Sequence, residues 1–457
     1  MKMLTLRNKL GYMCGDIGNN MSFAMSSTFL LAFYVDVIGL SAAAVGTLFL
    51  LARIWDGFND PLMGTIAERR YAKLNNINAD KFRPYLLKGS FLLAGCATLI
   101  FWVPESLSSG EKLAWAYLTY IAWGMSYTFV NIPYGSLASS MTQDAEEQAS
   151  LSTFRVFGAI IGSSIVKFIV PVFLTMFAND IGTGYLVAMA VCGAIGMSAH
   201  ITAFLNTKEN IKAKPQPMTP LGKQVKQLFT NKLLLVVSAA GLICLTALYG
   251  MGAVMMFWVK SNLNNDLSVL AISGVIDVIV MIVIIMVTPK LIQRFGLRSL
   301  IMLTCLGSIA VNVASYFIVD TANAFTISYF FASIFIMIPV SLMWSMVSDC
   351  IEYSQYKTGK REAGVIYSSY SLARKFAGAS AGAIAGIGVG LVGYNPELVT
   401  QTLTTQQGLQ GMMFLMPAVA SLMMFVLFKF FWTLTPEKRE QMVKHNQAML
   451  KLGDTNA

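Results

Sequence analysis

Two carboxylates occupy one face of an apolar stretch near the N-terminal end of the chain. In the segment ARIWDGFNDP, Asp56 and Asp60 are four residues apart, and Arg53 lies one turn before Asp56. In a helix this spacing places the side chains on one face. Because two carboxylates held close together repel, a cation or a proton between them is favoured. The spacing predicts a site for Na⁺, Li⁺ or H⁺ with Arg53 as counter-charge, and a purely structural cluster of two acids and one arginine is the alternative.

A second polar pair lies in the first apolar run. Asp16 and Asn20, in GDIGNN, are also four residues apart, with Gly15 directly before Asp16 and Gly18 between the two. Carboxylate and carboxamide groups form paired hydrogen bonds with sugar hydroxyls, so this pair suits a sugar site. Alternatively, the glycines allow close helix packing and Asp16 pairs with a base such as Lys375.

Two further apolar runs carry polar residues of the same kind. YTFVNIPYGS contains Asn131, and Pro133 in that run frees a backbone carbonyl one turn upstream. Transporters expose such groups at kinked helices that line a cavity. TFRVFGA contains Arg155, which is a candidate partner for a substrate, or alternatively extends to the membrane surface. Lys167, deeper in the same run, is a candidate partner for an acid of the first or second run.

The segment YSSYSLARKFAGASAGAIAG places Lys375 at the start of a row of small residues. A lysine inside an apolar run needs an acid across the bundle, and Asp16, Asp56 or Asp60 are candidates for a movable salt bridge. Alternatively, Lys375 extends to the cytoplasmic membrane surface. The other acid in an apolar run, Asp277, has no assigned partner.

The elements that hold these residues follow from composition. Of the 457 residues, 56% are hydrophobic and 12% charged, and runs long enough to cross a bilayer recur to residue 432. This predicts an all-α polytopic membrane protein with twelve transmembrane helices and excludes a soluble function. The expected spans are 10–38, 42–66, 83–104, 113–138, 153–178, 183–205, 232–259, 267–289, 298–319, 323–348, 363–394 and 407–432.

Basic residues alternate between the connections. Lysines and arginines fill the N-terminus, 69–83, 208–232, 290–298, 357–361 and 438–451, whereas the other connections hold only Lys112 and Lys260. TQDAEEQ is an acidic exception in the basic set. By the positive-inside rule both termini are cytoplasmic, and topology accounts for the net charge of +10 without nucleic acid.

A polar stretch divides the chain into two sets of six spans. We expect bundles at 1–205 and 232–432, a cytoplasmic linker at 206–231 and a cytoplasmic tail at 433–457. This is the organisation of the major facilitator fold, whose substrate site lies near mid-membrane between the two six-helix bundles. Within the linker, LGKQVKQLF has the spacing of a short amphipathic helix at the membrane surface.

Nothing in the sequence indicates an enzyme or a cofactor. The six cysteines are scattered singly and there are only two histidines, so we expect reduced packing cysteines and no Cys/His metal site. A nucleophile set, a metal motif and a phosphate loop are also lacking. The only metal ion we expect is Na⁺ at Asp56 and Asp60, if Na⁺ is the coupling ion.

Several segments together resemble the glycoside-pentoside-hexuronide:cation symporter family, the melibiose permease-like group. They are GYMCGDIGNN, FYVDVIGLSAAAVGTLFLLARIWDGFNDPLMG, KFRPYLL, VNIPYGSL, SDCIEYSQYKTGKREAG and LARKFAGASAGAIAGIGVGLVGYNP, in this order. The resemblance implies a major facilitator fold, a bacterial cytoplasmic (inner) membrane location, a monomer, and uptake of a glycoside coupled to H⁺, Na⁺ or Li⁺. Lipid or lysolipid movement on the same fold and a sugar sensor that does not transport are the rival functions.

The resemblance also implies binding residues. The cation site corresponds to Asp56, Asn59 and Asp60, with Thr128. The sugar site corresponds to Asp16, Asn20, Tyr127, Asn131, Arg155, Trp344, Ser371 and Lys375.

Two positions depart from the melibiose permease pattern. Asn131 stands where that pattern has an acid, and Gly135 where it has a tryptophan. The NIPYGSLA form resembles the branch of glucuronide and pentoside carriers, many of them proton-coupled. A less acidic pocket with Arg155 and Lys375 suits an anionic sugar, unless Asp16 and Asp56 neutralise these bases around a neutral glycoside.

The expected mechanism is symport by alternating access. One cation removes the repulsion between Asp56 and Asp60, so that the loaded carrier can change conformation. On the cytoplasmic side, Asp349 and Glu352 are expected to pair with nearby bases of the loops, such as Arg361, and to latch the inner side. An ordinary solvated loop is the alternative.

Overall fold

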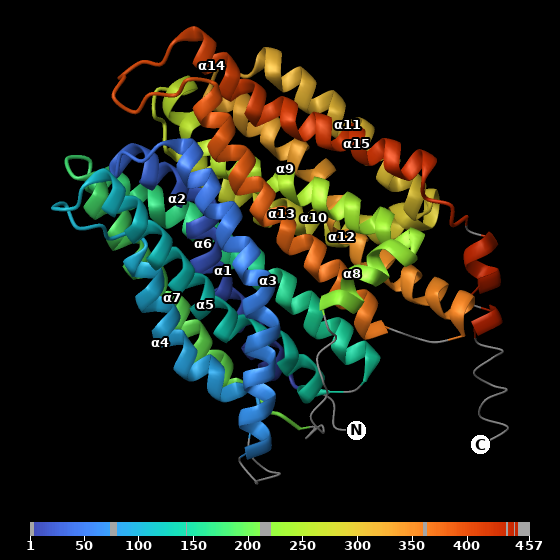
Figure 1. Cartoon of the computed structure of the whole chain (residues 1–457). Coiled ribbons are helices and arrows are strands. Elements are labelled where there is room, and N and C mark those ends of the chain that lie inside the picture. The colour runs from blue at the N-terminus through green and yellow to red at the C-terminus, as the bar shows by residue number, and fades with distance from the viewer. Residues whose placement is uncertain are drawn as a thin grey trace. The chain divides into compact units, whose positions relative to one another are not determined.

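The computed structural model describes residues 4–73, 80–142, 144–210, 221–359, 363–435, 437–442 and 444–446. Within α3, several side chains, including those of Arg53 and Asp60, also lie outside the described part. The elements are helical throughout these ranges, and no strand occurs in them (Figure 1). The all-α prediction is therefore confirmed for the described chain.

The first part of the chain forms one interrupted and five continuous helices. Two π-helical segments, Met25–Phe29 and Phe33–Val37, interrupt the first helical run. The bounds are α1 Leu6–Ala24, α2 Leu30–Ala32, α3 Ala42–Lys73, α4 Arg83–Leu99, α5 Ser109–Met141, α6 Ala145–Met176 and α7 Ile181–Asn206. Irregular turns of this kind inside a helix are frequent at functional sites.

The second part repeats this pattern of long helices. Its elements are α8 Leu221–Thr230, α9 Lys232–Asn262, α10 Ser268–Phe295, α11 Leu297–Ile318, α12 Ala322–Thr358, α13 Ala363–Leu391, α14 Leu403–Gln410, the π-helical segment Gly411–Leu415 and α15 Met416–Phe430. Each of the twelve expected apolar segments coincides with one of these helices or helical runs.

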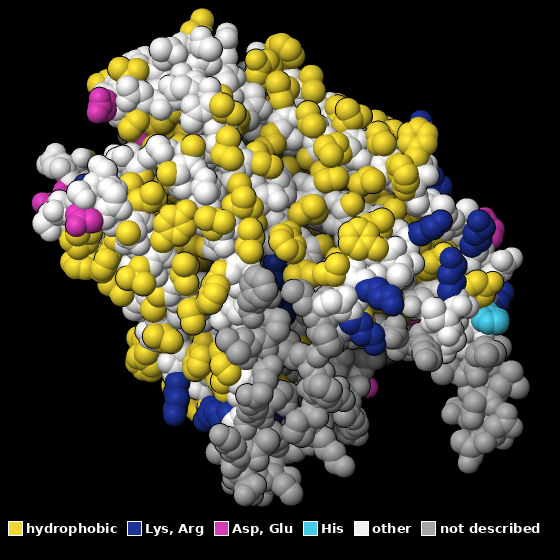
Figure 2. All heavy atoms as spheres, viewed as in Figure 1, with side chains coloured by type: hydrophobic (Ala, Val, Ile, Leu, Met, Phe, Trp, Pro, Cys, Tyr) yellow, Lys and Arg dark blue, Asp and Glu magenta, His cyan; other side chains and the backbone are white. Residues whose placement is uncertain are grey.

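Seven helices of the described chain are long and apolar enough to cross a membrane by length and composition. They are Ser150–Met176, Ile181–Asn206, Lys232–Asn262, Ser268–Phe295, Leu297–Ile318, Ala322–Thr358 and Leu403–Phe430. On the face shown in Figure 2, hydrophobic side chains cover much of the helical surface, and lysine and arginine side chains lie toward the helix ends. A multi-pass membrane protein is therefore indicated, while twelve crossings and the side of the termini stay predictions.

The chain separates into two compact units. Unit 1 comprises Met1–Met218, Gly252–Ile279 and Gly382–Leu409, and unit 2 comprises Thr219–Met251, Val280–Ala381 and Gln410–Ala457. Unit 1 therefore contains the first six long helices together with segments of the second half of the sequence. The expected bundle boundaries at 205 and 232 stay a prediction.

Helix α1 packs closely against α6 and α7 inside unit 1. A Cβ atom built on Gly162 of α6 would lie 2.7 Å from the carbonyl oxygen of Ile17, and one on Gly18 would lie 2.7 Å from the carbonyl oxygen of Gly196. Such distances are too short for a side chain, so glycine is required at both contacts. This close approach sets the position of Asp16 and its neighbours on α1.

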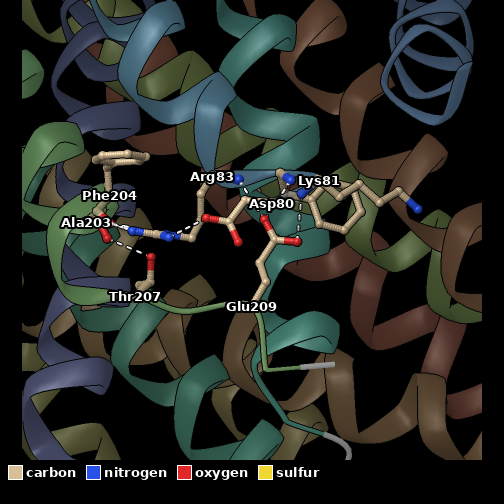
Figure 3. A network of polar contacts seen from close by, with 8 residues as sticks. Asp80, Lys81, Arg83, Ala203, Phe204, Thr207 and Glu209 are labelled. Carbon is tan, nitrogen blue, oxygen red and sulfur yellow. Dashed lines mark hydrogen bonds and ion pairs between the residues drawn. The ribbon is translucent and has the colours of Figure 1, made fainter. Parts of the chain in front are cut away.

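The first residues of the expected linker are bound to unit 1. The Glu209 carboxylate accepts hydrogen bonds from the backbone N–H groups of Lys81, Phe82 and Arg83 at 3.0, 2.7 and 2.9 Å (Figure 3). A carboxylate at a helix N-terminus satisfies donors that have no partner within the helix. Arg83 in turn donates from Nε to the carbonyl oxygen of Phe204 at 3.2 Å and pairs with Asp80. The loop after α7 is thereby fixed to the start of α4.

The predicted amphipathic segment within 206–231 is confirmed as a helix, α8. Its apolar side chains Val225 and Phe229 are exposed, Phe229 by 71%. Location of α8 at the membrane surface stays a prediction.

Candidate functional site

The cation-site residues that the structure describes lie on α3 and α5. Asp56 is half-buried on α3, and a Cβ atom built on Gly124 of α5 would lie 3.2 Å from Asp56 Oδ1. Thr128, one turn after Gly124 and therefore on the same face of α5, is buried, as is Asn59 on α3. The glycine thus gives the Asp56 carboxylate room against α5. The side chain of Asp60, the second acid of the expected pair, lies outside the described part.

The amide of Asn59 has an unusual environment. Its Nδ2 atom is buried, and no hydrogen-bond partner for it occurs in the part of the chain that the structure describes. A buried polar group without a partner is costly. An amide held in this way can present either its oxygen or its nitrogen to a ligand.

On the sugar side, Asp16 of α1 pairs with Arg155 of α6. The Nε atom of Arg155 lies 3.5 Å from Asp16 Oδ1, and its guanidinium lies 5.4 Å from the centre of the Tyr134 ring. Tyr134 is itself fixed, because its hydroxyl donates to the carbonyl oxygen of Tyr12 at 2.8 Å. The Arg155 side chain remains 34% exposed, so a paired guanidinium is still accessible.

Gly135 of α5 lies beside this pair. A Cβ atom built on Gly135 would lie 3.6 Å from Arg155 Nη1. A methyl group would fit there in ordinary contact, whereas an indole would occupy the space of the guanidinium. The departure from tryptophan at this position therefore makes room for Arg155.

Asn20 and Tyr127 lie on neighbouring surfaces of unit 1. Asn20 Nδ2 donates to the backbone carbonyl of Asp16 at 2.9 Å. Tyr127 of α5 is half-buried, and its ring lies 6.0 Å from that of Phe23 and 5.7 Å from that of Trp123. Asn20 is thus held by a hydrogen bond within α1, and Tyr127 by ring contacts with α1 and α5.

Asn131 belongs to a polar chain that the sequence did not predict. Asn19 Nδ2 lies 3.4 Å from Asn131 Oδ1, and Asn19 Oδ1 lies 3.1 Å from Nε2 of His200. Asn19 and His200 are fully buried, whereas Asn131 is half-buried. The available signals were the first asparagine of GDIGNN and a histidine in an apolar run.

The remaining sugar-site residues lie in unit 2. Trp344 of α12 stacks on Tyr367 of α13 at 4.9 Å between ring centres, and Arg374 lies 5.0 Å from the centre of the Trp344 ring. Ser371 and Lys375 follow Tyr367 at intervals of four residues and are half-buried on α13. The aromatic pair and these polar residues thus form one group within the unit.

Two further ion pairs inside unit 1 join the first six long helices to α9 and α10. Lys167 Nζ lies 2.6 Å from Asp277 Oδ2, where Gly274 lets α10 approach α6. We expected an acid of the first or second span as partner for Lys167, and the structure gives it the acid that had no assigned partner. Lys260 of α9 pairs with Asp36 at the end of the first helical run.

At the expected inner latch, the two acids of α12 contact the C-terminal tail. Asp349 of α12 pairs with Arg439 of the tail, with 2.7 Å between Oδ1 and Nε, and Asn446 Nδ2 donates to Glu352 Oε2 at 2.8 Å. The tail residues 437–442 and 444–446 are helical. A hydrogen bond from Lys444 holds the pKa of Glu440 below its usual range. Arg361 lies outside the described residues.

Long apolar helices with charged and amide side chains between them define a polytopic membrane transporter. The family model described as MFS/sugar transport protein matches residues 11–434, and the chain belongs to this family. It is therefore a transporter and not an enzyme, and the resemblance to the glycoside-pentoside-hexuronide:cation symporters is confirmed.

Two relatives cover nearly the whole chain. The uncharacterized symporter YjmB of Bacillus subtilis strain 168 is 34% identical over 446 residues, which are 97% of this chain and 95% of that protein. The glucuronide carrier protein homolog of Escherichia coli K12 is 31% identical over 452 residues, with the same coverage of 97% and 95%.

A solved structure shows the same fold at low sequence identity. The inward-open xylose transporter XylE of Escherichia coli has a TM-score of 0.63 at 13% identity, covering 96% of this chain and 98% of that one. The expected major facilitator fold is thereby supported over almost the full length of the chain.

Proposed function

We propose that this protein imports a glycoside by symport with H⁺ or Na⁺ through alternating access, as a monomer in the bacterial inner membrane with both termini cytoplasmic. The observation that carries this proposal is the Asp16–Arg155 ion pair, in which the Arg155 side chain is partly exposed. The pair lies beside Gly135, on the same side of α5 as Asn131. Its paired charges and amide can hold the hydroxyl and carboxyl groups of a small sugar.

The cation site we propose consists of Asp56, Asn59, Asp60 and Thr128. With both carboxylates ionised, their repulsion and hydration oppose closure around the site. One bound cation removes that penalty, so that the loaded carrier changes conformation and the half-loaded carrier does not. The contact of Asp56 with Gly124 supports this, because α5 also carries the sugar-site residues Tyr127 and Asn131.

For the substrate, we favour an anionic sugar such as a glucuronide. Arg155 faces one carboxylate, and Asn131 adds no negative charge beside it. A guanidinium has donors whose geometry matches a carboxylate bidentately. The relative named as a glucuronide carrier homolog agrees with this choice. A neutral glycoside or pentoside is the alternative if Lys375 and Arg155 are neutralised by the acids around them.

For the gates, we propose that Lys260–Asp36 and Lys167–Asp277 close the outer side. Both pairs link the first six long helices to α9 or α10, and the positive-inside rule assigns the Asp36 end to the outside. Opening that side requires both pairs to separate. Asp349 and Glu352 would act on the cytoplasmic side, where Arg439 and Asn446 of the tail contact them.

The experiment that tests this function is external pH in weakly buffered, de-energised cells expressing the protein. A panel of neutral glycosides and glucuronides is added with and without Na⁺. Alkalinisation by one sugar without Na⁺ identifies the substrate and proton symport, and Na⁺-dependent radiolabel entry without a pH change identifies sodium. Binding without flux for every sugar would instead indicate a sensor, and no response to any sugar would contradict the proposal.

A further inference from the structure

A groove on the surface of unit 1 runs between α4 and α7, which lie side by side (Figure 1). Its volume is about 620 Å³, which falls within the range of roughly 300–1,000 Å³ found for ligand sites. Small residues contribute much of its lining, namely Gly95, Ala190 and Ala194. All three are exposed, so the groove opens to the surroundings of unit 1.

The floor and the opening of the groove follow from its small residues. A Cβ atom built on Gly193 would lie 3.6 Å from the Cβ atom of Ala94, so α4 and α7 are in contact there. A Cβ atom built on Gly95 would meet no neighbouring atom within 4 Å, so this position faces open space. The Thr98 hydroxyl donates to the carbonyl oxygen of Ala94 at 2.9 Å and needs no partner in the groove. The groove is therefore suited to an apolar occupant.

The groove has the length of one leaflet of a bilayer. It extends along α7 from Leu186 to Met197, which is about 16 Å along the helix axis. This segment begins near the start of the apolar helix Ile181–Asn206 and ends just beyond its middle. Half of the hydrocarbon core of a bilayer is about 15 Å thick. The dimensions match an acyl chain that runs from one membrane surface to mid-membrane, and the positive-inside rule makes that surface the outer one.

Two tryptophans mark the end of the groove at this surface. Trp102 lines the groove just beyond the end of α4 and is 45% exposed. Its ring centre lies 5.7 Å from that of Trp115 of α5, and Trp115 Nε1 donates to the carbonyl oxygen of Trp102 at 2.8 Å. Tryptophan is enriched at the level of the lipid headgroups. The headgroup of a bound lipid would therefore lie beside this pair.

A base and an acid flank the tryptophan pair. Lys112 lies on α5 one turn before Trp115, hence on the same helix face, and Glu105 follows Trp102 by three residues. Lys112 is half-buried and Glu105 is exposed. The neighbouring carboxylate of Glu111 is already bound, because it caps the start of α5 through hydrogen bonds of 2.8 and 2.7 Å. One base and one accessible acid match a headgroup that carries both a phosphate and an amine.

We propose that the groove binds one phospholipid of the outer leaflet, with an acyl chain between α4 and α7, the phosphate at Lys112 and an amine at Glu105. Phosphatidylethanolamine has this chemistry, whereas phosphatidylglycerol lacks the amine. Other lipid chains are as apolar as the groove, so the chain contributes packing contacts, and selection of this lipid depends on the headgroup. The site requires neither a sugar nor a coupling ion and is independent of the proposed function.

The test measures phosphatidylethanolamine binding to the delipidated full-length protein in detergent by native mass spectrometry. We expect one tightly bound lipid, with a Kd about fivefold lower than that of phosphatidylglycerol, the effect of about one hydrogen bond. Gly95→Leu and Ala194→Leu place a side chain in the groove. Each should raise the Kd of phosphatidylethanolamine at least about tenfold, because the leucine displaces two or more methylene groups of the acyl chain.

Ala310→Leu is the matched control, because Ala310 is an exposed alanine of the apolar helix Leu297–Ile318 and lies outside the groove. It should leave the Kd within about twofold of the wild-type value. For the headgroup, Glu105→Gln should abolish the preference for phosphatidylethanolamine, and Lys112→Gln should weaken the binding of both lipids.

Three results would overturn the proposal. An equal Kd for the wild type and both leucine variants of the groove would exclude the groove as the lipid site. An equal Kd of the two lipids for the wild type would refute the assigned headgroup contacts. A dimer that is lost in Gly95→Leu and Ala194→Leu would assign the groove to a second copy of the chain. No sugar is used, so failure of the proposed symport would leave this test intact.

Discussion

At the scale of single residues, the Asp56 carboxylate lies half-buried beside Gly124 of α5, where the absence of a side chain leaves room for it. We expect Asp56→Asn to abolish concentrative uptake, with an accumulation ratio of about one, because a neutral amide no longer makes closure depend on the cation. Radiolabelled sugar accumulation measures this, and sugar binding to the purified variant should persist in part. Asp56→Glu, which keeps the charge, is the control, and normal accumulation by the asparagine variant would disprove the assignment.

Gly135 gives a second prediction, on substrate choice. Gly135→Trp should raise KM at least about tenfold, because the indole takes the space of the Arg155 guanidinium and separates it from the substrate. Gly135→Ala should change KM by less than about twofold, since its methyl group would lie in ordinary contact with Arg155 Nη1. Uptake kinetics of both variants decide the matter, and full transport by the tryptophan variant would show that Arg155 has no part in binding.

Single residues also mark the limit of what the sequence could predict. Asp16 and Asn20 follow from spacing on one helix, and the structure ties Asn20 to the Asp16 backbone. The pairing of Arg155 with Asp16 could not be predicted from spacing, because that contact joins residues far apart in the chain. The same holds for His200 and Asn19, 181 residues apart, whose packing depends on glycines at a helix crossing. The periodicity of a local sequence predicts which residues share a helix face. It does not predict which faces of different helices contact each other.

At the scale of elements, α6 and α10 are joined by Lys167 and Asp277, whose side chains are only 13% and 14% exposed. Lys167→Met removes the ammonium group that pairs with the buried Asp277 carboxylate, so it should destabilise the protein by about 3 kcal/mol. Thermal unfolding in detergent measures this loss.

The double variant is the control for this pair. Lys167→Met with Asp277→Leu replaces both charges by apolar groups and should recover most of the lost stability. Additive losses in the double variant would mean that the two residues act separately. The sequence located both charges in apolar runs but could not join them, because 110 residues separate them.

At the scale of the whole molecule, the twelve helical segments followed from hydropathy, because the bilayer requires long apolar helices. The loops were harder to predict. Asp349 was expected to pair within the cytoplasmic loops, yet the structure pairs it with Arg439, 90 residues further along the chain. The tail therefore competes for an acid that the proposed inner latch also requires.

This competition predicts opposite effects of two substitutions on the conformational equilibrium. Asp349→Ala should favour the state open to the cytoplasm, because the proposed latch loses its acid, whereas Arg439→Ala should favour closure there by releasing that acid. The reporter is disulfide formation between Thr28→Cys and Gly252→Cys in a cysteine-free background, since a Cβ atom on Gly252 lies 3.8 Å from Thr28 Oγ1. Equal disulfide yields in the two variants would contradict this competition between the tail and the inner latch for Asp349.

The backbone-to-backbone packing of α1 on α6 and α7 has a consequence for inhibitors. Helices in such close contact resist sliding past each other, so we expect α1, α6 and α7 to move as one rigid body during the transport cycle. Asp16 and Arg155 then keep their geometry whichever side of the membrane the cavity faces. A compound that contacts only this surface of α1 and α6 would bind in the same pose from the periplasm and from the cytoplasm. Only its contacts with the moving helices would make it selective for one side of the membrane.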